Sequence, residues 1–178
     1  HGLEVILHAC EILKKKQFTF MLHILGTSEE KAKPYKELAE LLNLGNTVLF
    51  RNDLRFADDS LPNWLCSNCD IAFGLFGSSK KAKTVLVNKV VESLSMGIPV
   101  ISQPSEGIVE FLEPGREIET VTAKPENLAE GIQKLISQKE YTLMLAENGL
   151  RKYQETFTVS KFTNDFSAII RKVTGEHD

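Results

Sequence analysis

Residues 71–107, IAFGLFGSSKKAKTVLVNKVVESLSMGIPVISQPSEG, decide our prediction of the fold. The apolar run at 71–76 is typical of a buried strand, and we expect a loop over 77–87 after it. A helical pattern opens at Asn88, which we expect to cap that helix, and a second short strand is predicted at 99–102. Strand, helix and strand in this order indicate a parallel βαβ unit.

The same alternation continues on both sides of this unit. We expect further strands at 18–25, 47–51 and 117–122, and helices at 3–16, 28–44, 61–69, 105–112, 125–137, 140–155 and 160–174. Pro34 is expected to delay or kink its helix. Strands separated by helices predict one α/β domain over 1–178, with a Rossmann-like, doubly wound parallel sheet and a helical C-terminal tail. Because such sheets usually begin with a strand, we expect a first strand outside this chain.

Composition excludes several classes of protein. The 178 residues suit one domain, and a formal net charge of -3 gives no basic field for nucleic acid. No run approaches the roughly 18 apolar residues of a membrane span, and the N-terminal residues do not resemble a signal peptide. Three cysteines do not form a disulfide framework. We therefore expect a cytoplasmic protein, with at most peripheral association at the inner face of the membrane.

A positive segment lies where ligands bind in open parallel sheets, beyond the carboxyl ends of the strands. No Asp or Glu occurs over 71–91, and Gly77 at the strand end is followed by lysines. These lysines are Lys80, Lys81, Lys83 and Lys89. Together with a helix N-terminus they favour an anion such as a diphosphate. A solvated lysine loop is the structural alternative.

Two neighbouring features fit the same ligand. Glu92 lies one turn into the helix that follows, where a carboxylate either complements the helix dipole or accepts hydrogen bonds from ribose hydroxyls. Residues 105–107 join the next strand to a short helix and offer backbone N–H groups to an anion. An ordinary strand-to-helix connection is the alternative for these three residues.

Other polar and aromatic residues are given structural roles. Cys66 and Cys69 form a C-x-x-C pair without further ligands at zinc spacing, so we expect small buried packing residues rather than a metal or redox site. Asp58 and Asp59 precede a helix and are expected to cap it. Trp64 and the phenylalanines are expected in the core, and no metal site is predicted.

The chain resembles the group 1 family of retaining glycosyltransferases, and specifically the C-terminal, donor-binding domain of their two-domain GT-B fold. NKVVESLSMGIPVISQPSEGIVEFLEPG, at 88–115, resembles the family's glutamate-bearing helix with the "(A/S)xGxPV" motif and the loop after it. LEVILHACEILKK after Gly2 is similar to the family's first helix, and TVLFRND at 47–53 to the strand before the base pocket. LPNWLCSNCDIAFGLFG at 61–77 resembles the family's "lpxxyxxADvxvxPs" segment.

The resemblance implies roles for individual residues. It implies that Glu92 holds the donor's ribose, that Arg51 and Asn52 lie beside the nucleobase, and that Gly2 begins the helix facing the diphosphate. By the same resemblance, the loop near the donor sugar and phosphates is formed by Ser105, Glu106 and Gly107. The family's first glutamate, eight residues before Glu92, is replaced by Thr84. We expect Lys83 and Lys89 to supply charge there and to stabilise the phosphates.

The implied activity is transfer of a hexose from a UDP- or GDP-sugar to a glycan or lipid-linked acceptor, as in polysaccharide biosynthesis. No cofactor or metal is implied, and the acceptor domain is expected in a missing N-terminal half, so this part alone is expected to be inactive. Two alternatives stay open. One is a non-catalytic nucleotide-binding module, and the other is an NAD-dependent oxidoreductase domain, although no G-x-G-x-x-G pattern occurs.

Overall fold

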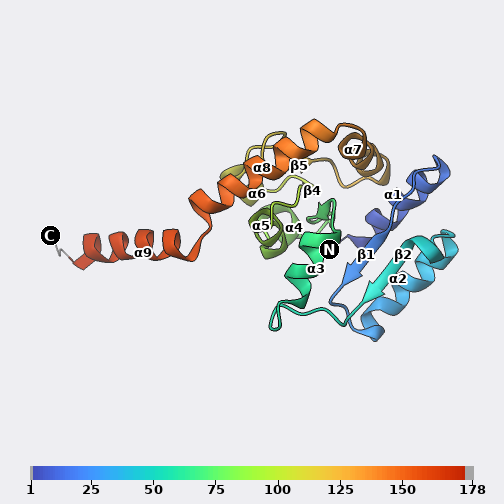
Figure 1. Cartoon of the computed structure of the whole chain (residues 1–178), viewed down its shortest axis with the longest axis horizontal. Helices are drawn as coiled ribbons and strands as arrows, with labels where there is room; N and C mark the ends of the chain where they lie inside the picture. Colours follow the sequence, from blue (N-terminus) through green and yellow to red (C-terminus); the bar gives the residue numbers. More distant parts are fainter. Residues whose placement is uncertain (1, 175–178) are drawn as a thin grey trace.

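The structure is a computed structural model that describes residues 2–174. Helices and strands alternate along this part of the chain, as the sequence predicts (Figure 1). The strands are β1 (Leu22–Leu25), β2 (Val48–Arg51), β3 (Ala72–Phe73), β4 (Val100–Ser102) and β5 (Glu119–Thr120). The helices are α1 (Leu3–Lys15), α2 (Glu29–Leu41), α3 (Ser60–Asn68), α4 (Lys80–Thr84), α5 (Asn88–Ser95), α6 (Glu106–Phe111), α7 (Pro125–Ser137), α8 (Lys139–Thr156) and α9 (Val159–Thr174), with a 3-10 turn, η1, at Gly45–Thr47.

The strands form two parallel ladders. β1 pairs with β2, Leu22 opposite Val48, while β4 pairs with β3 on one side and with β5 on the other. Parallel pairing throughout confirms the predicted crossover connections. The strands are shorter than predicted, and β3 shows why. Gly74 still donates to Ile101, but Leu75 then leaves the ladder pattern: its N–H goes to the Ser102 hydroxyl at 3.1 Å and its carbonyl oxygen accepts the N–H of Gln103 at 2.9 Å.

Helices cover both faces of the strands. Along β4, Ile101 packs into a core shared with α1 and α7, while Val100 packs into a second core with α5 and α6. Successive side chains of a strand point to opposite faces, so these two neighbouring residues contribute to the cores on both sides of the sheet. The predicted doubly wound α/β architecture is confirmed by this arrangement.

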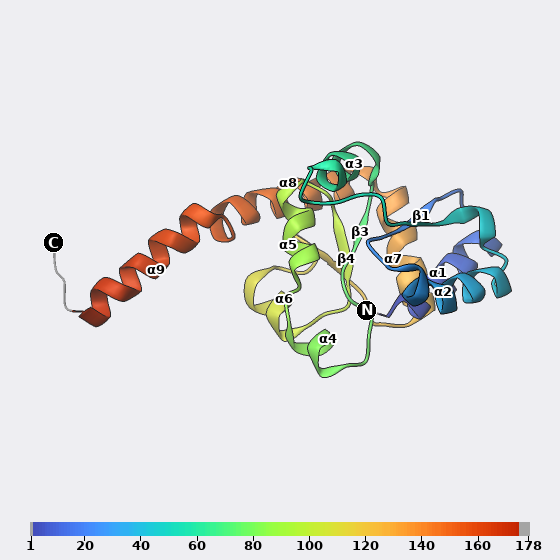
Figure 2. The same cartoon turned by 90° about the horizontal axis from the view of Figure 1, so that it is seen from below.

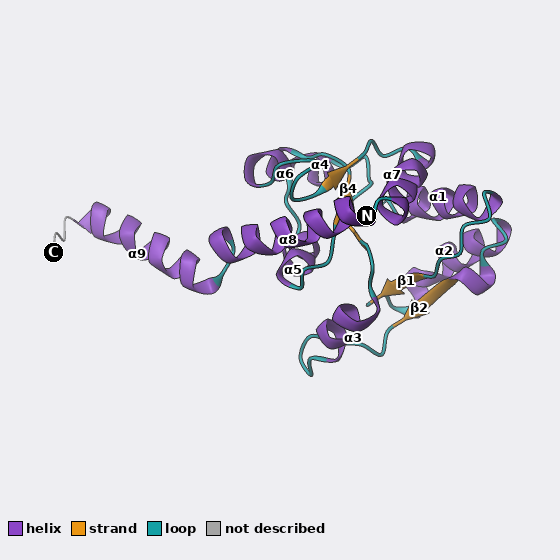
Figure 3. Cartoon of the chain, turned by 45° about the horizontal axis from the view of Figure 1, so that its top comes forward, coloured by secondary structure: helices purple, strands orange, loops and turns teal. Residues whose placement is uncertain are grey.

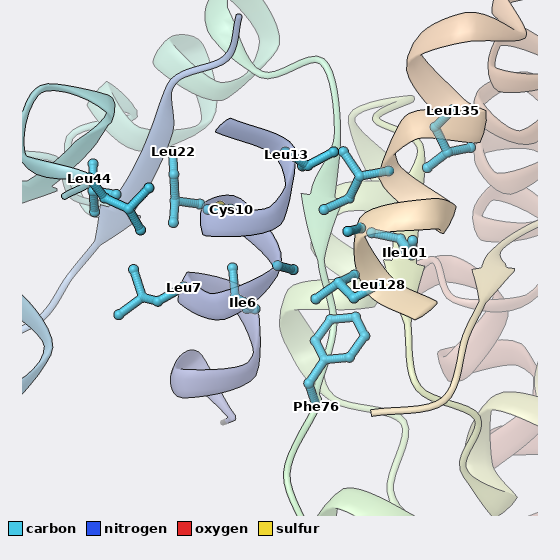
Figure 4. Packing of buried hydrophobic residues seen from close by; sticks show 14 of the residues in the cluster. Ile6, Leu7, Cys10, Leu13, Leu22, Leu44, Phe76, Ile101, Leu128 and Leu135 are labelled. Carbon is cyan, nitrogen blue, oxygen red and sulfur yellow. The ribbon is translucent and has the colours of Figure 1, made fainter. Parts of the chain in front are cut away.

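Helix α1 lies between the two ladders. Its buried side chains recur at helical spacing; Leu7 and Cys10 lie toward β1, and Leu13 lies toward α7 (Figure 4). Lys14 and Lys15 occupy its last turn, where positive charge complements the helix dipole. This helix therefore joins the two halves of the larger core.

Helix α2 begins where the sequence places it. The Ser28 hydroxyl caps it by accepting the backbone N–H of Lys31. Pro34 lies inside the helix, so the expected delay of its start is wrong. The ring removes only one N–H donor from a helix that already has a cap and whose buried residues, Ala32 and Ala39, hold it against the core.

The C-terminal helices form the predicted tail. α8 packs along α5, whereas α9 projects away from the rest of the molecule, as all three overall views show (Figures 1, 2 and 3). No side chain of α9 is buried. Phe162 and Phe166 stack on one another on this exposed helix, so the expectation that they belong to the core is wrong.

Candidate functional site

The lysine-rich segment after β3 contains a helix rather than only a loop. Ser79 occupies the N-cap of α4, and its hydroxyl accepts the backbone N–H of Ala82 at 3.2 Å. The prediction of a loop over 77–87 is therefore wrong at 80–84. A serine cap followed by lysines and alanine, which favour helix, was the signal for this element. Ala82 is buried, and the lysines on either side of it are exposed.

A buried glutamine fixes α4 to the end of β4. Gln103 is 6% exposed, and its Nε2 donates to the carbonyl oxygen of Ala82 at 2.8 Å. Its Oε1 is buried and has no hydrogen-bond partner within the described residues. Leaving a buried acceptor without a partner costs free energy of folding, so a hydrogen-bond donor that reached this oxygen would stabilise the structure. Nothing in the sequence pattern around Gln103 predicts this burial or its contact with α4.

Helix α5 carries the two predicted donor-binding residues. Lys89 and Glu92 are three residues apart and therefore neighbours on one helical face. Both side chains are half-buried, and within residues 2–174 neither charged group makes a hydrogen bond or ion pair. Burial lowers the pKa of Lys89 to about 8. A half-buried lysine and carboxylate that do not pair with protein groups remain available to a ligand.

The start of α5 differs from the prediction by one residue. Val87 occupies the N-cap and Asn88 is the first helical residue, so the predicted cap at Asn88 is wrong. No side chain caps this end. The first backbone N–H groups of α5 consequently have no capping side chain, in the segment that also carries Lys89.

Residues 105–107 fix the position of α6 next to the segment that leads into α5. Ser105 is buried and caps α6 by accepting the N–H of Ile108 at 3.1 Å, while its hydroxyl donates to the carbonyl oxygen of Val85 at 3.2 Å. A Cβ on Gly107 would lie 2.5 Å from the backbone nitrogen of Leu86. The Ser105 hydroxyl and the missing Gly107 side chain therefore hold α6 against the segment leading into α5.

A pocket of about 570 Å³ opens between α4 and α6, which lie next to each other in Figure 2, whereas α5 runs beside β4. Its lining residues are Lys83, Pro104, Ser105, Glu106, Val109 and Glu110. The structure thus brings together three predicted site residues, Lys83, Ser105 and Glu106. With one lysine against two glutamates, the pocket wall itself is not positive.

Two glycines that are 75 positions apart in the sequence meet at the end of β3. Gly2 caps α1 with a φ of 74°, and a Cβ placed on it would lie 2.2 Å from the carbonyl oxygen of Phe76 and 2.8 Å from the nitrogen of Gly77. Only glycine permits both this conformation and this approach. The N-terminus of α1 therefore sits against the start of the lysine-rich segment.

Arg51 and Asn52 belong to a different cluster, at the end of β2. Arg51 pairs with Asp53 through two hydrogen bonds of 3.1 and 2.6 Å and lies 5.1 Å from the Trp64 ring centroid. Trp64 also contacts the His23 ring, with centroids 4.6 Å apart. Asn52 is exposed. Within the described residues, neither residue makes a hydrogen bond, ion pair or ring contact with the lysine-rich segment.

The remaining sequence predictions concern structural residues. The Thr84 hydroxyl donates to the carbonyl oxygen of Lys80 inside α4. Asp58 accepts the backbone N–H of Ser60, the first residue of α3, at 3.0 Å, whereas Asp59 occupies the N-cap without a side-chain cap hydrogen bond, so the predicted capping role is confirmed for Asp58 alone. Cys66 is exposed and Cys69 half-buried, so the expectation of two buried packing residues is wrong. Across residues 2–174, no helix combines the length and apolarity that a bilayer crossing requires.

The sequence and the fold of this chain are both similar to those of known glycosyltransferases. A family model described as "Glycosyl transferases group 1" matches residues 1–138. No curated protein matches the sequence. Among solved structures, the chain is similar to sucrose-phosphate synthase from Thermosynechococcus elongatus, with a TM-score of 0.81, 16% identity, and coverage of 98% of this chain and 42% of that one.

Two further structures show the same likeness. A glycosyltransferase from Rickettsia africae gives a TM-score of 0.80 at 20% identity, covering 99% of this chain and 45% of that one. HepE from Anabaena, in complex with UDP-glucose, gives 0.77 at 18% identity, covering 95% and 44%. The chain therefore has the Rossmann-like fold of the C-terminal half of GT-B glycosyltransferases, and it spans less than half the length of these three chains.

Proposed function

Because this chain belongs to the group 1 glycosyl transferases, we propose that it is a single donor-binding domain, over 1–178, of a retaining glycosyltransferase. Its ligand is a nucleotide diphosphate sugar with UDP or GDP as the nucleotide. HepE, which shares the fold, has been solved with UDP-glucose, and that supports this ligand class. The transferred group is a hexose, and the acceptor is a glycan or a lipid-linked sugar, as in polysaccharide biosynthesis.

One observation carries the proposal. Lys89 is half-buried in the first turn of α5 and makes no ion pair within the described residues, yet it lies one turn from an equally unpaired Glu92. Holding a lysine in this state costs free energy unless a ligand compensates it. A diphosphate beside Lys89 and a ribose beside Glu92 would use both groups at once.

The chemistry follows from where charge develops. When the sugar leaves the nucleotide, negative charge builds on the oxygens of the β-phosphate. We propose that Lys89, Lys83 and the N–H groups at the start of α5, which no side chain caps, stabilise that charge. These groups neutralise the leaving phosphate through lysine and backbone donors, so the proposed reaction includes no metal ion or cofactor.

The acceptor would be bound elsewhere in a longer protein. The chain covers 42–45% of the three compared chains, which leaves room for a second domain. We propose an N-terminal acceptor domain, and activity only when both domains enclose the substrates, because positioning two reactants supplies much of the rate. The proposed setting is the cytoplasm, with at most peripheral contact with the membrane.

Calorimetric titration of residues 1–178 with UDP, GDP, ADP and NAD tests the ligand class. We expect one nucleoside diphosphate to bind, and Glu92→Ala and Lys89→Met each to weaken its binding at least about tenfold, as for loss of a charged hydrogen-bond partner. Glu155→Ala and Lys139→Met, exposed positions on α8, are the matched controls. Tight binding of NAD alone would refute the donor-domain proposal.

Chemistry requires a second test on the longer chain. Incubation with the donor identified above and an acceptor series should release the nucleoside diphosphate, and NMR of the product should show the anomeric configuration of the donor. Product with the opposite configuration would refute the retaining mechanism. Binding without turnover for any acceptor would favour a non-catalytic nucleotide-binding module.

A further inference from the structure

Two of the three cysteines lie together at the end of α3. Cys66 is in the last turn of the helix and is exposed, and Cys69 follows the helix as its C-cap residue and is half-buried. The third cysteine, Cys10, is buried in the core on α1, where burial raises the pKa of its thiol to about 12. Because a thiol reacts as its thiolate and must be reached by the reagent, Cys10 is inert while the pair on α3 is accessible.

Backbone geometry keeps the two cysteines of α3 within reach of each other. Cys69 donates its N–H to the carbonyl oxygen of Leu65 at 2.9 Å, so its Cα continues the helical path of α3. Residues three apart in an α-helix have Cα atoms about 5 Å apart, inside the roughly 4.4–6.8 Å that disulfides span. The dihedral angles of Cys69 are extended, with φ -105° and ψ 112°, so turning its side chain toward Cys66 leaves the helical hydrogen bonds of α3 in place.

The hydrogen bond that the Cys69 thiol makes is exchanged at little cost. Its Sγ donates to the carbonyl oxygen of Ile71 at 3.4 Å, and a thiol is a weak donor. Desolvation by burial raises the pKa of Cys69, so this thiol stays protonated at neutral pH. The two cysteines therefore differ in an oxidation: the exposed Cys66 meets the oxidant first, and Cys69 is the neighbouring thiol that can then react with it.

We propose that Cys66 and Cys69 are a redox modification site, which hydrogen peroxide converts into an intramolecular disulfide. The Cys66 thiolate attacks one peroxide oxygen, the O–O bond breaks, Cys66 becomes a sulfenic acid, and the other oxygen leaves as water with the proton of the first thiol. The Cys69 sulfur then attacks the Cys66 sulfur, the S–S bond forms, and the sulfenic oxygen leaves as a second water with the proton of the second thiol. Two electrons pass from the sulfurs to the peroxide. This inference does not rest on the proposed function.

The turn that the disulfide would constrain also holds Trp64. The Trp64 carbonyl oxygen accepts a hydrogen bond of 2.9 Å from the side-chain amide of Asn68, in the last turn of α3. The indole contacts the ring of His23, with centroids 4.6 Å apart, where α3 lies beside β1 (Figure 3). The same ring centroid is 5.1 Å from the guanidinium carbon of Arg51 at the end of β2. Oxidation of the pair should therefore change the surroundings of Trp64 as well as the two sulfurs.

Mass spectrometry of residues 1–178 after treatment with hydrogen peroxide provides the direct test. We expect the chain to lose the mass of two hydrogen atoms, to retain Cys10 as its one thiol that is alkylated after unfolding, and to yield a peptide in which Cys66 is linked to Cys69. A dithiol reductant should reverse the change. Cys69→Ser should instead stop at a sulfenic acid on Cys66, which dimedone traps, and Cys66→Ser should stay unmodified at the same dose.

Three other outcomes of the peroxide experiment would overturn the proposal. A sulfinic acid on Cys66 beside a free Cys69 thiol would show that the two sulfurs do not meet. Disulfides between two chains, in a yield that rises with protein concentration, would identify a second copy as the partner of Cys66. A chain that stays fully reduced at a dose that oxidises free cysteine would show that Cys66 is unreactive.

The indole N–H resonance of Trp64 tests whether oxidation reaches this side chain. Trp64 is the one tryptophan of the chain, so its NMR signal needs no assignment by mutation. We expect the resonance to shift on oxidation and to return with the dithiol reductant, and we expect no shift when Cys66→Ser is treated in the same way. An unchanged resonance in a chain whose disulfide has formed would overturn the effect on Trp64.

Discussion

The side-chain amide nitrogen of Gln103 donates a hydrogen bond to the carbonyl oxygen of Ala82 across 2.8 Å. The contact joins the end of β4 to the middle of α4, the helix that presents Lys83. Gln103 is buried, so water does not readily replace it. The position of the lysines thus depends on a residue that is separated from them by 20 or more positions in sequence.

We expect Gln103→Met to loosen α4. Methionine has a similar shape but leaves the Ala82 carbonyl oxygen unpaired, which should lower the free energy of unfolding by about 1–2 kcal/mol. Amide exchange within α4 should become faster, and nucleoside diphosphate binding several-fold weaker. Gln154→Met, at an exposed position on α8, is the control. Unchanged exchange in α4 would show that other contacts hold this helix.

Burial of Lys89 should make stability depend on pH. Its folded-state pKa is about 8, below the usual 10.5, so between these values the unfolded chain binds more protons than the folded chain. The free energy of unfolding should therefore rise with pH through this window, by at most about 3 kcal/mol relative to Lys89→Met. Denaturant titrations from pH 7 to about pH 11 measure the difference. The difference in the free energy of unfolding between the unmodified chain and Lys139→Met should not change with pH.

Ligand binding should respond to the same titration in the opposite direction. Above about pH 8 the free protein increasingly holds Lys89 neutral, so a diphosphate loses its partner. We expect affinity to fall by up to about tenfold per pH unit there. Calorimetry on Lys89→Arg, which keeps its charge, should show a weaker pH dependence. If the affinity of the two proteins changed with pH in the same way, Lys89 would not be a ligand-binding residue.

Alanine substitutions at three glycines distinguish the cost of backbone strain from the cost of a steric clash. Gly45→Ala should change the free energy of unfolding by less than about 1 kcal/mol, since a Cβ there meets nothing within 4 Å. Gly26→Ala adds the strain of a φ of +71° and should cost about 1–2 kcal/mol. Gly2→Ala adds a clash with Phe76 and should cost more than either. Thermal unfolding ranks the three, and a Gly2 variant as stable as Gly26→Ala would show that α1 can shift away from β3.

Much of the fold could be predicted because local patterns and packing agree. The apolar spacing of α1 is set by neighbouring residues, and the structure confirms the helix that it predicts. Strand lengths could not be predicted in this way. Beyond β3, Gly74 still donates to Ile101, but the N–H of Leu75 goes to the hydroxyl of Ser102, 27 positions away. Such a replacement depends on a tertiary contact rather than on strand propensity.

Several residues of the candidate site could be predicted from the sequence, but their contacts with one another could not. Lys83, Ser105 and Glu106 do line one pocket, but Ser105 is occupied as a helix cap. Gln103 could not be singled out, because a glutamine at a strand end carries no signal of its burial. The half-buried state of Lys89 likewise depends on residues packed around it, and sequence pattern alone does not distinguish it from the exposed lysines of α4.

Helix α9 has a consequence for how the purified chain behaves in solution. It contributes no buried side chain, yet one side of it exposes six large apolar residues: Val159, Phe162, Phe166, Ile169, Ile170 and Val173. A contiguous apolar surface of this kind promotes association between molecules. We therefore expect the last helix to limit the solubility of the chain without contributing to its buried core. A chain ending at Phe157 should unfold at nearly the same temperature and remain dispersed at higher concentration.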